Sequence, residues 1–164
     1  MNQPLLKCEH VDFGYENYDV VKDVSMEIVP GDYLCIVGEN GSGKSTLMKI
    51  LFGLIPITSG QVFLRGEEVH FNSSSDAIAA GIGMVHQHFM LVDSLTGAEN
   101  MMLGMEKTSF VSNKKRDIQI TNEVAKKYNF DIDASRRVRD MSVGMKQKLE
   151  ILKILYRSAK LIIL

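Results

Sequence analysis

Residues 38–46 read Gly-Glu-Asn-Gly-Ser-Gly-Lys-Ser-Thr and match the pattern G-x-x-x-x-G-K-[ST] in full. Glycines in such a loop let the backbone approach a ligand closely, so that successive N–H groups can face phosphate oxygens. Lys44 supplies a full positive charge, and the hydroxyl of Ser45 is placed to bind Mg2+. The motif therefore predicts binding of a nucleoside triphosphate. The predicted contact residues are Gly38, Glu39, Asn40, Gly41, Ser42, Gly43, Lys44, Ser45 and Thr46.

The sequence on either side of this motif predicts the elements that a phosphate-binding loop requires. The apolar residues 33–37 precede it and predict a parallel strand that is buried on both faces. Residues 44–52 follow without a helix breaker and predict a helix that ends at Gly53. Glycine and serine also form ordinary strand-to-helix loops, but the complete match in this context favours a phosphate site.

The composition is that of one globular domain. The chain has 164 residues, 45% of them hydrophobic, and a formal net charge of −1, which does not favour a nucleic-acid-binding protein. Basic residues 114–116 and 136–137 are expected on solvated faces. Cys8 and Cys35 lack ligand spacing and indicate a reducing compartment, with Cys35 expected in the core. Because no signal-like segment and no apolar run of about 20 residues occurs, the sequence predicts a cytoplasmic protein that meets a membrane only through a partner.

The N-terminal half predicts short strands and one short helix besides those around the motif. Strict alternation of apolar and polar residues in 11–13 and 24–28 predicts antiparallel strands with one wet face. Residues 62–71 read as a hairpin, 75–80 as a short helix, and 82–86 as another apolar strand.

The C-terminal half predicts mainly helices. Residues 91–139 are polar and include a helix at 117–128. The residues expected near one side of that helix are Ile118, Ile120 or Thr121, Val124 and Tyr128. A last helix, 144–158, leads into residues 161–164, which are expected to form another buried parallel strand. The apolar face expected for the last helix consists of Met145, Leu149, Leu152 and Tyr156.

Two smaller features leave alternatives open. His86 and His88 would share a face if their strand continued, but two ligands without a Cys or carboxylate cluster do not make a zinc site. Met101, Met102 and Met105 either fill a core or form an adaptable docking surface.

Three features beyond the phosphate loop identify a family. Tyr15 precedes the loop, Gln87 follows the strand at 82–86, and Ser142-Val143-Gly144 opens the last helix. In this order the motifs resemble those of the ATP-binding subunits of ABC transporters. The resemblance implies that Tyr15 stacks on adenine, that residues 38–45 are the Walker A loop, and that Gln87 lies near Mg2+ and the attacking water. It also implies that Ser142 and Gly144 bind the γ-phosphate held by a second, head-to-tail ATPase domain.

A finer resemblance is to the simple-sugar and nucleoside importers of that family. It rests on residues 76–78 and 81–92, on Leu95-Thr96 and on Glu99-Asn100. In that branch two such ATPase domains lie in tandem on one polypeptide, and Ser-Val-Gly is typical of the first. Two positions depart from the family pattern. Met141 stands where a leucine is usual, and Met145 where a polar residue is usual.

The resemblance implies an α/β fold of the P-loop NTPase class, with a RecA-like core around a mostly parallel sheet, an antiparallel β subdomain and a helical subdomain. The expected division is 1–90 for the β subdomain and core, 91–140 for the helical subdomain, and 141–164 for the signature helix and the last strand. The implied partners are ATP, Mg2+, a second ATPase domain and transmembrane permease subunits at the inner face of the cell membrane.

One feature of the family is absent from the sequence. In the family, a strand such as 161–164 is followed by an aspartate and by a glutamate that polarises the attacking water, and the sequence ends before them. The chain as given is therefore expected to bind nucleotide weakly and to hydrolyse it poorly or not at all. The alternatives are a truncated nucleotide-binding module without hydrolysis and a non-transport ABC ATPase of translation or DNA repair. The latter should show a longer linker between paired domains or a coiled-coil insertion, and neither appears between Gln87 and Ser142.

Overall fold

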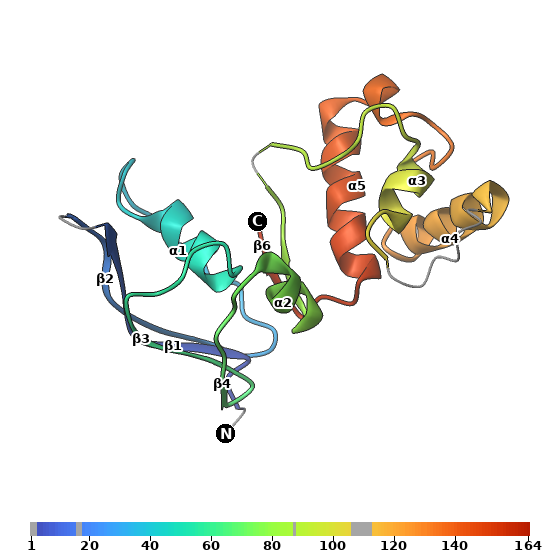
Figure 1. Ribbon diagram of the computed structural model, residues 1–164. Coiled ribbons are helices and arrows are strands. Elements are labelled where there is room, and N and C mark those ends of the chain that lie inside the picture. Colours follow the sequence, from blue (N-terminus) through green and yellow to red (C-terminus); the bar gives the residue numbers. More distant parts are fainter. Residues whose placement is uncertain (1–2, 16–17, 87, 106–112) are drawn as a thin grey trace. The chain divides into compact units, whose positions relative to one another are not determined.

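The computed structural model of the chain describes residues 3–15, 18–86, 88–105 and 113–164 (Figure 1). The chain divides into two compact units, one comprising Met1–Gly83 with Ile163 and the other Met84–Ile162 with Leu164. None of the helices in the described ranges is both long enough and apolar enough to cross a membrane.

The first unit contains an antiparallel sheet of four strands in the order β2-β1-β3-β4. The strands are β1 (Leu6–Tyr15), β2 (Tyr18–Ile28), β3 (Ser59–Leu64) and β4 (Glu67–Glu68). Cys8 of β1 lies opposite Met26 of β2 on one side and Val62 of β3 on the other. Because side chains alternate along a strand, alternate residues of β1 enter the core, and burial raises the pKa of the Cys8 thiol to about 11. The antiparallel strands and the hairpin predicted from the sequence are confirmed, although β4 has only two residues.

An irregularity in β1 and β2 is held by polar side chains. The pairing register shifts between Cys8 and Val11, where His10 has a positive φ of 49°. It shifts again between Val11 and Phe13, where Asp23 of the paired strand has the same φ. Nδ1 of His10 lies 2.6 Å from Oδ1 of Asp23, and the backbone N–H of Asp23 donates to Oδ1 of Asp12 at 2.7 Å. These contacts satisfy groups that the shifted ladder leaves unpaired.

Asp23→Asn is expected to lower the pKa of His10. The hydrogen bond to Asp23 and the charge of its carboxylate raise the pKa of the imidazole above its ordinary value of 6.5. Because the folded-state pKa is the raised one, the pair stabilises the folded chain at pH values below 6.5, and this stabilisation is lost as pH rises through the folded-state pKa. NMR titration of the His10 ring protons measures the change. Asp19→Asn, another exposed carboxylate of β2, is the control, and an equal His10 pKa in both variants would contradict the prediction.

Helix α1 (Lys44–Leu51) follows the glycine loop, as predicted. It buries the apolar side chains of Leu47, Ile50 and Leu51. Its C-terminus is closed by two backbone hydrogen bonds, from Gly53 to the carbonyl of Ile50 at 2.9 Å and from Leu54 to the carbonyl of Lys49 at 2.8 Å. Gly53 has a φ of +70°, which this type of helix end requires. The predicted glycine C-cap is therefore confirmed. The short helix predicted near residue 75 is also present as α2 (Ser74–Ala79).

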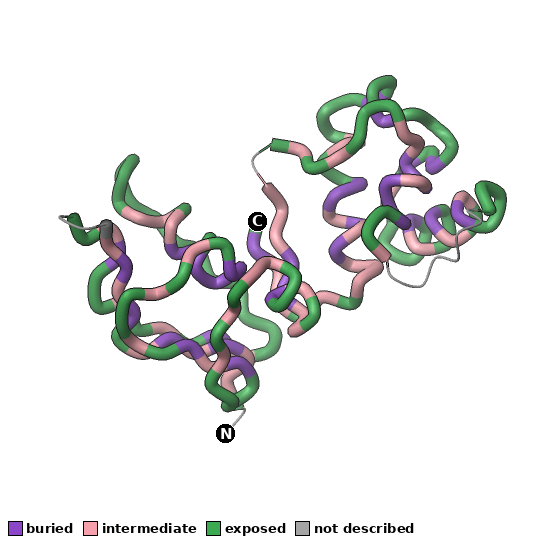
Figure 2. The backbone as a smooth tube through the Cα atoms, viewed as in Figure 1, coloured by how far each residue is buried: buried purple, intermediate pink, exposed green. Residues whose placement is uncertain are grey.

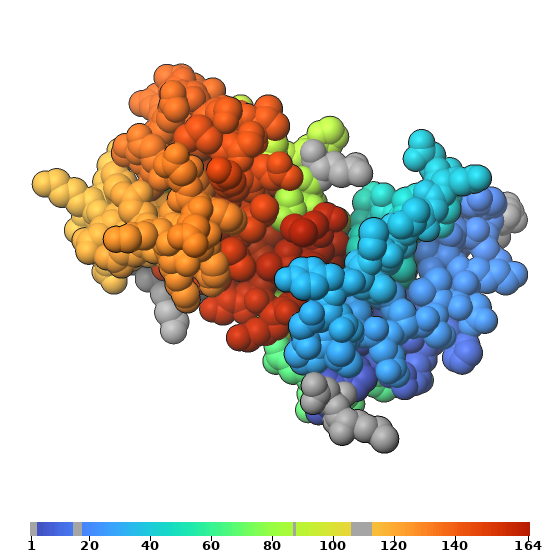
Figure 3. All heavy atoms as spheres, turned by 180° about the vertical axis from the view of Figure 1, so that it is seen from behind, coloured from blue at the N-terminus to red at the C-terminus, as the bar shows by residue number. Residues whose placement is uncertain are grey.

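Residues 33–37 do not form the buried parallel strand that the sequence predicts. Residues 32–39 have no regular secondary structure, and the tube of Figure 2 is green over this segment because its residues are exposed. The segment lies on the face of the molecule seen in Figure 3, in the light-blue spheres. Val37 is 87% exposed, and Cys35, expected in the core, is exposed as well. A run that is apolar on both faces is stable as a strand only where neighbouring strands pair with its backbone, and among the described residues no strand does so.

The second unit is helical, as residues 91–139 predict. Its helices are α3 (Gly97–Met102), α4 (Lys114–Lys127), the 3₁₀-helix η1 (Val138–Asp140) and α5 (Val143–Tyr156). Thr96 caps α3, since its hydroxyl accepts from the N–H of Glu99 while the Glu99 carboxylate accepts from the N–H of Thr96. The basic residues 114–116 and 136–137 are exposed, as predicted.

The inward face of α4 agrees with the prediction only in part, at Thr121 and at Val124, which packs against the buried cluster of this unit. The buried residues are Asp117, Thr121 and Ala125, whereas Ile118 is only partly buried and Tyr128 is exposed. Thr121 can be buried because its hydroxyl donates to the carbonyl oxygen of Asp117 at 2.8 Å within the helix. A search for apolar residues at helical spacing does not find the buried Asp117.

The core of the second unit lies between α5 and the other helices, where Figure 2 shows the buried purple segments of these helices. Leu149 and Leu152 of α5 are fully buried, and Met145 and Tyr156 pack against the same cluster. The predicted apolar face of α5 is thus confirmed. The other buried members of this hydrophobic cluster are Met101, Ala125, Ile132, Val138 and Met141. Burial of Met101 and Met102 favours core filling over a docking surface for these two methionines.

Two further strands, β5 (Ile82–Met84) and β6 (Leu161–Ile163), form a two-stranded sheet. Both strands are shorter than predicted, and Leu164, expected to be buried, is 86% exposed. The mostly parallel sheet expected from the family resemblance does not occur in the described ranges, where the larger sheet is antiparallel. A parallel sheet is usually covered by helices on both faces. The short two-stranded sheet of β5 and β6 is too small to be the sheet that was expected.

Candidate functional site

The phosphate-loop motif forms a curled loop that its own lysine holds. The ammonium group of Lys44 donates to the carbonyl oxygens of Gly38 at 2.7 Å and Glu39 at 2.6 Å, and lies 3.3 Å from the hydroxyl of Ser42. The N–H of Ser42 also donates to the carbonyl of Glu39 at 3.2 Å. The loop therefore closes around a positive charge that sits at the start of α1.

The start of α1 adds backbone donors to this charge. Gly43 is the N-cap residue, and no side chain caps the helix. The first turn of an α-helix leaves its N–H groups without intrahelical partners, so those of Lys44, Ser45 and Thr46 are free to bind an anion. Ser45 is exposed beside Lys44 and can offer its hydroxyl to a cation carried by that anion. The arrangement is suited to a magnesium-bound phosphate chain.

Gly43 also brings the loop close to the sheet. Its φ is +85°, and a Cβ at this position would overlap the carbonyl oxygen of Val20 in β2. Gly41 has almost the same φ, +86°, but a Cβ there would meet no atom within 4 Å. The two glycines thus differ in one respect, the contact with β2.

Gly43→Ala is expected to destabilise the chain by about 1–3 kcal/mol and to remove nucleotide binding, because it adds both backbone strain and a clash with Val20. Gly41→Ala is the matched control. It adds only the strain of the left-handed conformation, about 1 kcal/mol. Urea denaturation and titration with a fluorescent ATP analogue measure the two effects. Equal losses for the two variants would contradict a role for the contact with β2.

The second predicted motif opens α5. Ser142 is the N-cap residue of this helix, and its hydroxyl accepts from the N–H of Met145 at 3.3 Å. Ser142, Val143 and Gly144 are all exposed, and a Cβ added at Gly144 would meet no atom within 4 Å. This helix start is accessible, and no contact with the part of the chain that the structure describes explains why residue 144 is a glycine.

The structure leaves two predicted site residues without a described side chain. Tyr15 ends β1, where it pairs with Tyr18, and only its backbone is described. Gln87 lies outside the described residues. The loop 38–46 belongs to the first compact unit, and Ser142 with Gly144 belongs to the second. No group of three or more His, Cys, Asp or Glu side chains in the described ranges could hold a metal ion, and His88 is exposed.

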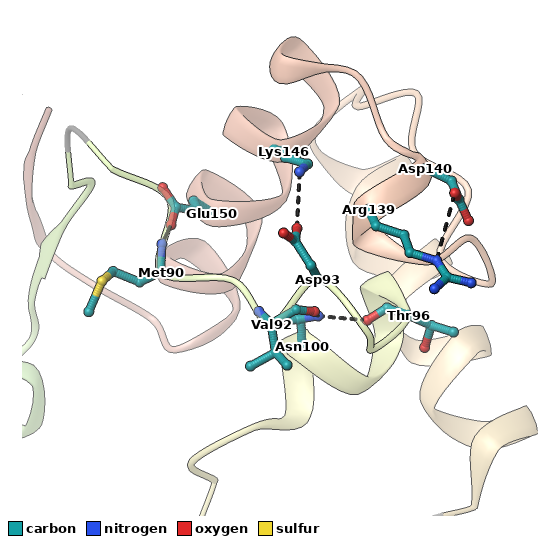
Figure 4. Close-up of polar contacts among 9 residues, drawn as sticks. All are labelled: Met90, Val92, Asp93, Thr96, Asn100, Arg139, Asp140, Lys146 and Glu150. Atoms are coloured by element: carbon teal, nitrogen blue, oxygen red, sulfur yellow. Dashed lines mark hydrogen bonds and ion pairs between the residues drawn. The ribbon is translucent and has the colours of Figure 1, made fainter.

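The sequence did not predict a group of polar contacts between α5 and residues 90–93 (Figure 4). Lys146 pairs with Asp93 at 3.0 Å, and the carboxylate of Glu150 accepts from the backbone N–H of Met90. The signal that could have found them is the acidic Glu150 between Leu149 and the apolar residues that follow it, where a buried position is expected to be apolar. Its partner Met90 lies 60 residues away in the sequence, so no local pattern identifies it.

A protein-family model described as ABC transporter matches residues 21–164, which is most of the chain. The chain belongs to the ABC transporter family. Within this family it is similar to the guanosine import ATP-binding protein NupO of Bacillus subtilis, with 46% identity over 142 residues, covering 86% of this chain and 28% of NupO. It is 39% identical over 163 residues to the nucleoside import ATP-binding protein NupA of Lactococcus lactis, covering 99% of this chain and 32% of NupA. This ABC chain spans about a third of the length of these relatives.

Solved ABC proteins share the fold. The ATP-binding cassette MJ1267 in its ADP conformation superimposes with a TM-score of 0.83 at 20% identity, covering 97% of this chain and 67% of MJ1267. The protein cbiO1 of Clostridium perfringens, part of the ABC transporter complex cbiONQ, superimposes with a TM-score of 0.79 at 21% identity, covering 98% of this chain and 64% of cbiO1. The chain therefore has the ABC ATPase cassette fold.

Proposed function

We propose that this chain is part of the ATP-binding subunit of an importer of nucleosides or simple sugars, and that residues 38–46 bind ATP. The observation that carries the proposal is the position of the Lys44 ammonium group, which lies 2.7 Å from the carbonyl oxygen of Gly38. Lys44 is the first residue of α1, and the N–H groups of a first helical turn have no partners within the helix. NupO is a guanosine import ATP-binding protein and NupA a nucleoside import ATP-binding protein, which supports a nucleoside as the transported solute.

Each site residue has one task in this proposal. Lys44 and the N–H groups of α1 neutralise the phosphates, and the exposed hydroxyl of Ser45 would hold Mg2+, which neutralises further charge on the same phosphates. The ring of Tyr15 would stack on adenine, and Gln87 would orient the attacking water. Catalysis of phosphoryl transfer depends on such positioning and charge neutralisation more than on covalent chemistry.

The exposed start of α5 fits a nucleotide held by another ATPase domain. Ser142 offers a hydroxyl and Gly144 an unpaired N–H in the first turn, both accessible from outside the chain. In the proposed cycle ATP joins two such domains, and its hydrolysis lets them separate and drives transmembrane permease subunits at the inner face of the membrane.

The proposal is tested with the full-length polypeptide and its permease subunits in lipid vesicles, by measuring ATP-dependent uptake of guanosine, ribose and glucose. Gly144→Asp is the informative variant. An aspartate in the first turn of α5 favours the helix, and its Cβ has free space, so the fold should be retained. Its negative charge would repel the phosphate, so uptake should be lost. Uptake that persists in Gly144→Asp would contradict the role of α5, and ATP binding without turnover in the parent protein would favour a binding-only module.

A further inference from the structure

Two charged side chains on one face of α5 hold the segment 90–93 in the second unit (Figure 4). Lys146 and Glu150 are four residues apart and therefore lie on the same side of the helix. The ammonium group of Lys146, with its side chain only 19% exposed, pairs with Oδ1 of Asp93 at 3.0 Å. The carboxylate of Glu150, a residue only 6% exposed, accepts from the N–H of Met90. We call these two contacts the α5 clasp.

The same segment is fixed from its other side. The fully buried amide of Asn100 accepts from the N–H of Val92 at 2.8 Å and donates to the carbonyls of Val92 and Thr96, both at 3.0 Å. The N–H of Arg139 donates to the carbonyl of Asp93 at 3.0 Å. The segment 90–93 has no helix or strand of its own, so these side chains replace the hydrogen bonds that such elements would provide.

Burial of the Glu150 carboxylate costs desolvation free energy, which a purely structural role does not require. Among the described residues, its second carboxylate oxygen, Oε2, is buried without a hydrogen-bond partner. Lys153 lies one turn further along α5, and its own half-burial lowers its pKa, while attraction to Glu150 acts in the opposite direction. A buried carboxylate with incomplete hydrogen bonding contributes little to folding and is often replaced by an apolar residue without loss of stability. The presence of a carboxylate at this buried position therefore points to a requirement other than stability.

The clasp links the helix that one predicted motif opens to the segment that follows the other predicted motif in the sequence. Lys146 is one turn after Ser142, at the start of the helix whose N-terminus is proposed to contact phosphate. Asp93 and Met90 belong to the segment that starts three residues after Gln87 in the sequence. A displacement of this segment along α5 would change the distance between the described chain that follows Gln87 in the sequence and the helix start at Ser142. Small errors of this kind in a catalytic arrangement are costly.

We infer that Lys146 and Glu150 are positioning residues for ATP hydrolysis, which fix the segment 90–93 on α5 and thereby set the placement of Ser142 relative to the chain that follows Gln87. The inference rests on the proposed function. Neither residue is among those proposed to contact the nucleotide, so nucleotide affinity is not expected to depend on them directly.

The test uses the full-length ATPase assembled with its permease subunits. Glu150→Met removes the carboxylate but keeps the side-chain length, and Glu150→Gln keeps an oxygen that can accept from the N–H of Met90. We expect Glu150→Met to lower kcat for ATP by about 10-fold or more, with KM for ATP changed less than about twofold. The Tm should stay equal or rise, because a partly unpaired buried charge is removed. Glu150→Gln should restore most of kcat.

The ion pair provides an independent arm of the same test. Lys146→Met and Asp93→Asn should each lower kcat, and the double variant should lower it no further than either one, because both remove the same contact. Lys115→Met, an exposed lysine of α4, is the matched control and should keep the parental kcat.

Three results would overturn the inference. The first is a kcat for Glu150→Met equal to that of Lys115→Met. The second is a kcat that falls only together with Tm and is not restored by Glu150→Gln, since that is the behaviour of a purely structural residue. The third is an absence of Lys44-dependent ATP turnover in the parent protein, which would also overturn the proposed function. Normal parental turnover with an unaffected Glu150→Met would overturn the inference alone.

Discussion

Lys44→Ala should weaken ATP binding by about 100-fold, because a charge-assisted hydrogen bond contributes about 1.5–3 kcal/mol and the ammonium group can make more than one to the phosphates. The loop itself should also change, since the same group donates to the carbonyl oxygens of Gly38 and Glu39. Titration of the chain with a fluorescent ATP analogue, in the presence and absence of Mg2+, measures the loss.

Lys49→Ala is the matched control for this loss. Lys49 belongs to the same helix, α1. It is exposed in the last turn of the helix, whereas the glycine loop precedes the first turn. The control should keep the parental affinity, and both variants should keep the parental Tm because each removes a side chain from the surface of one helix. Binding by Lys44→Ala within about twofold of the control would contradict the assignment of the phosphate site.

Local signals in the sequence identified those elements that are stabilised by near neighbours. β1 and β2 were predicted because strict alternation allows only one face to be buried, and the observed pairing of the two strands keeps that face inside. α1 was predicted together with its end at Gly53, since a glycine that can adopt positive φ is a strong stop signal. The conformation of the loop could be anticipated for the same reason, because Gly41 and Gly43 both have the positive φ that the motif requires.

The features that the sequence did not predict correctly depend mainly on residues far away in the sequence. Residues 33–37 carry the composition of a buried strand, but composition does not supply the neighbouring strands that must pair with it. The family relatives are about three times as long as this chain, so most of their residues have no counterpart here. The inward face of α4 was misjudged at Asp117, a buried carboxylate that an apolar pattern passes over, and at Tyr128, which is exposed. The partners of Glu150 and Lys146 are 60 and 53 residues distant, beyond the range of any periodic pattern.

Helix α5 combines two opposite requirements. Its first turn must be accessible, and Ser142 and Gly144 are exposed there. Its middle must be immobile, and Leu149 and Leu152 are fully buried. The buried part therefore determines how precisely the exposed part is held, which makes the apolar face of α5 a determinant of the proposed phosphate contact as well as of stability.

Leu149→Ala should destabilise the second unit by about 2–5 kcal/mol, because it removes a fully buried side chain and leaves a cavity among closely packed residues. Hydrogen exchange of the α5 amides in the intact chain measures the local free energy of opening. Leu103→Ala is the matched control, since Leu103 is the same residue type in the same unit but 44% exposed, and its loss should stay below about 1 kcal/mol. If α5 exchanges equally in both variants, the cluster around Leu149 does not anchor the helix. A loss confined to Leu149→Ala would establish that the exposed start of α5 depends on the core beneath its middle.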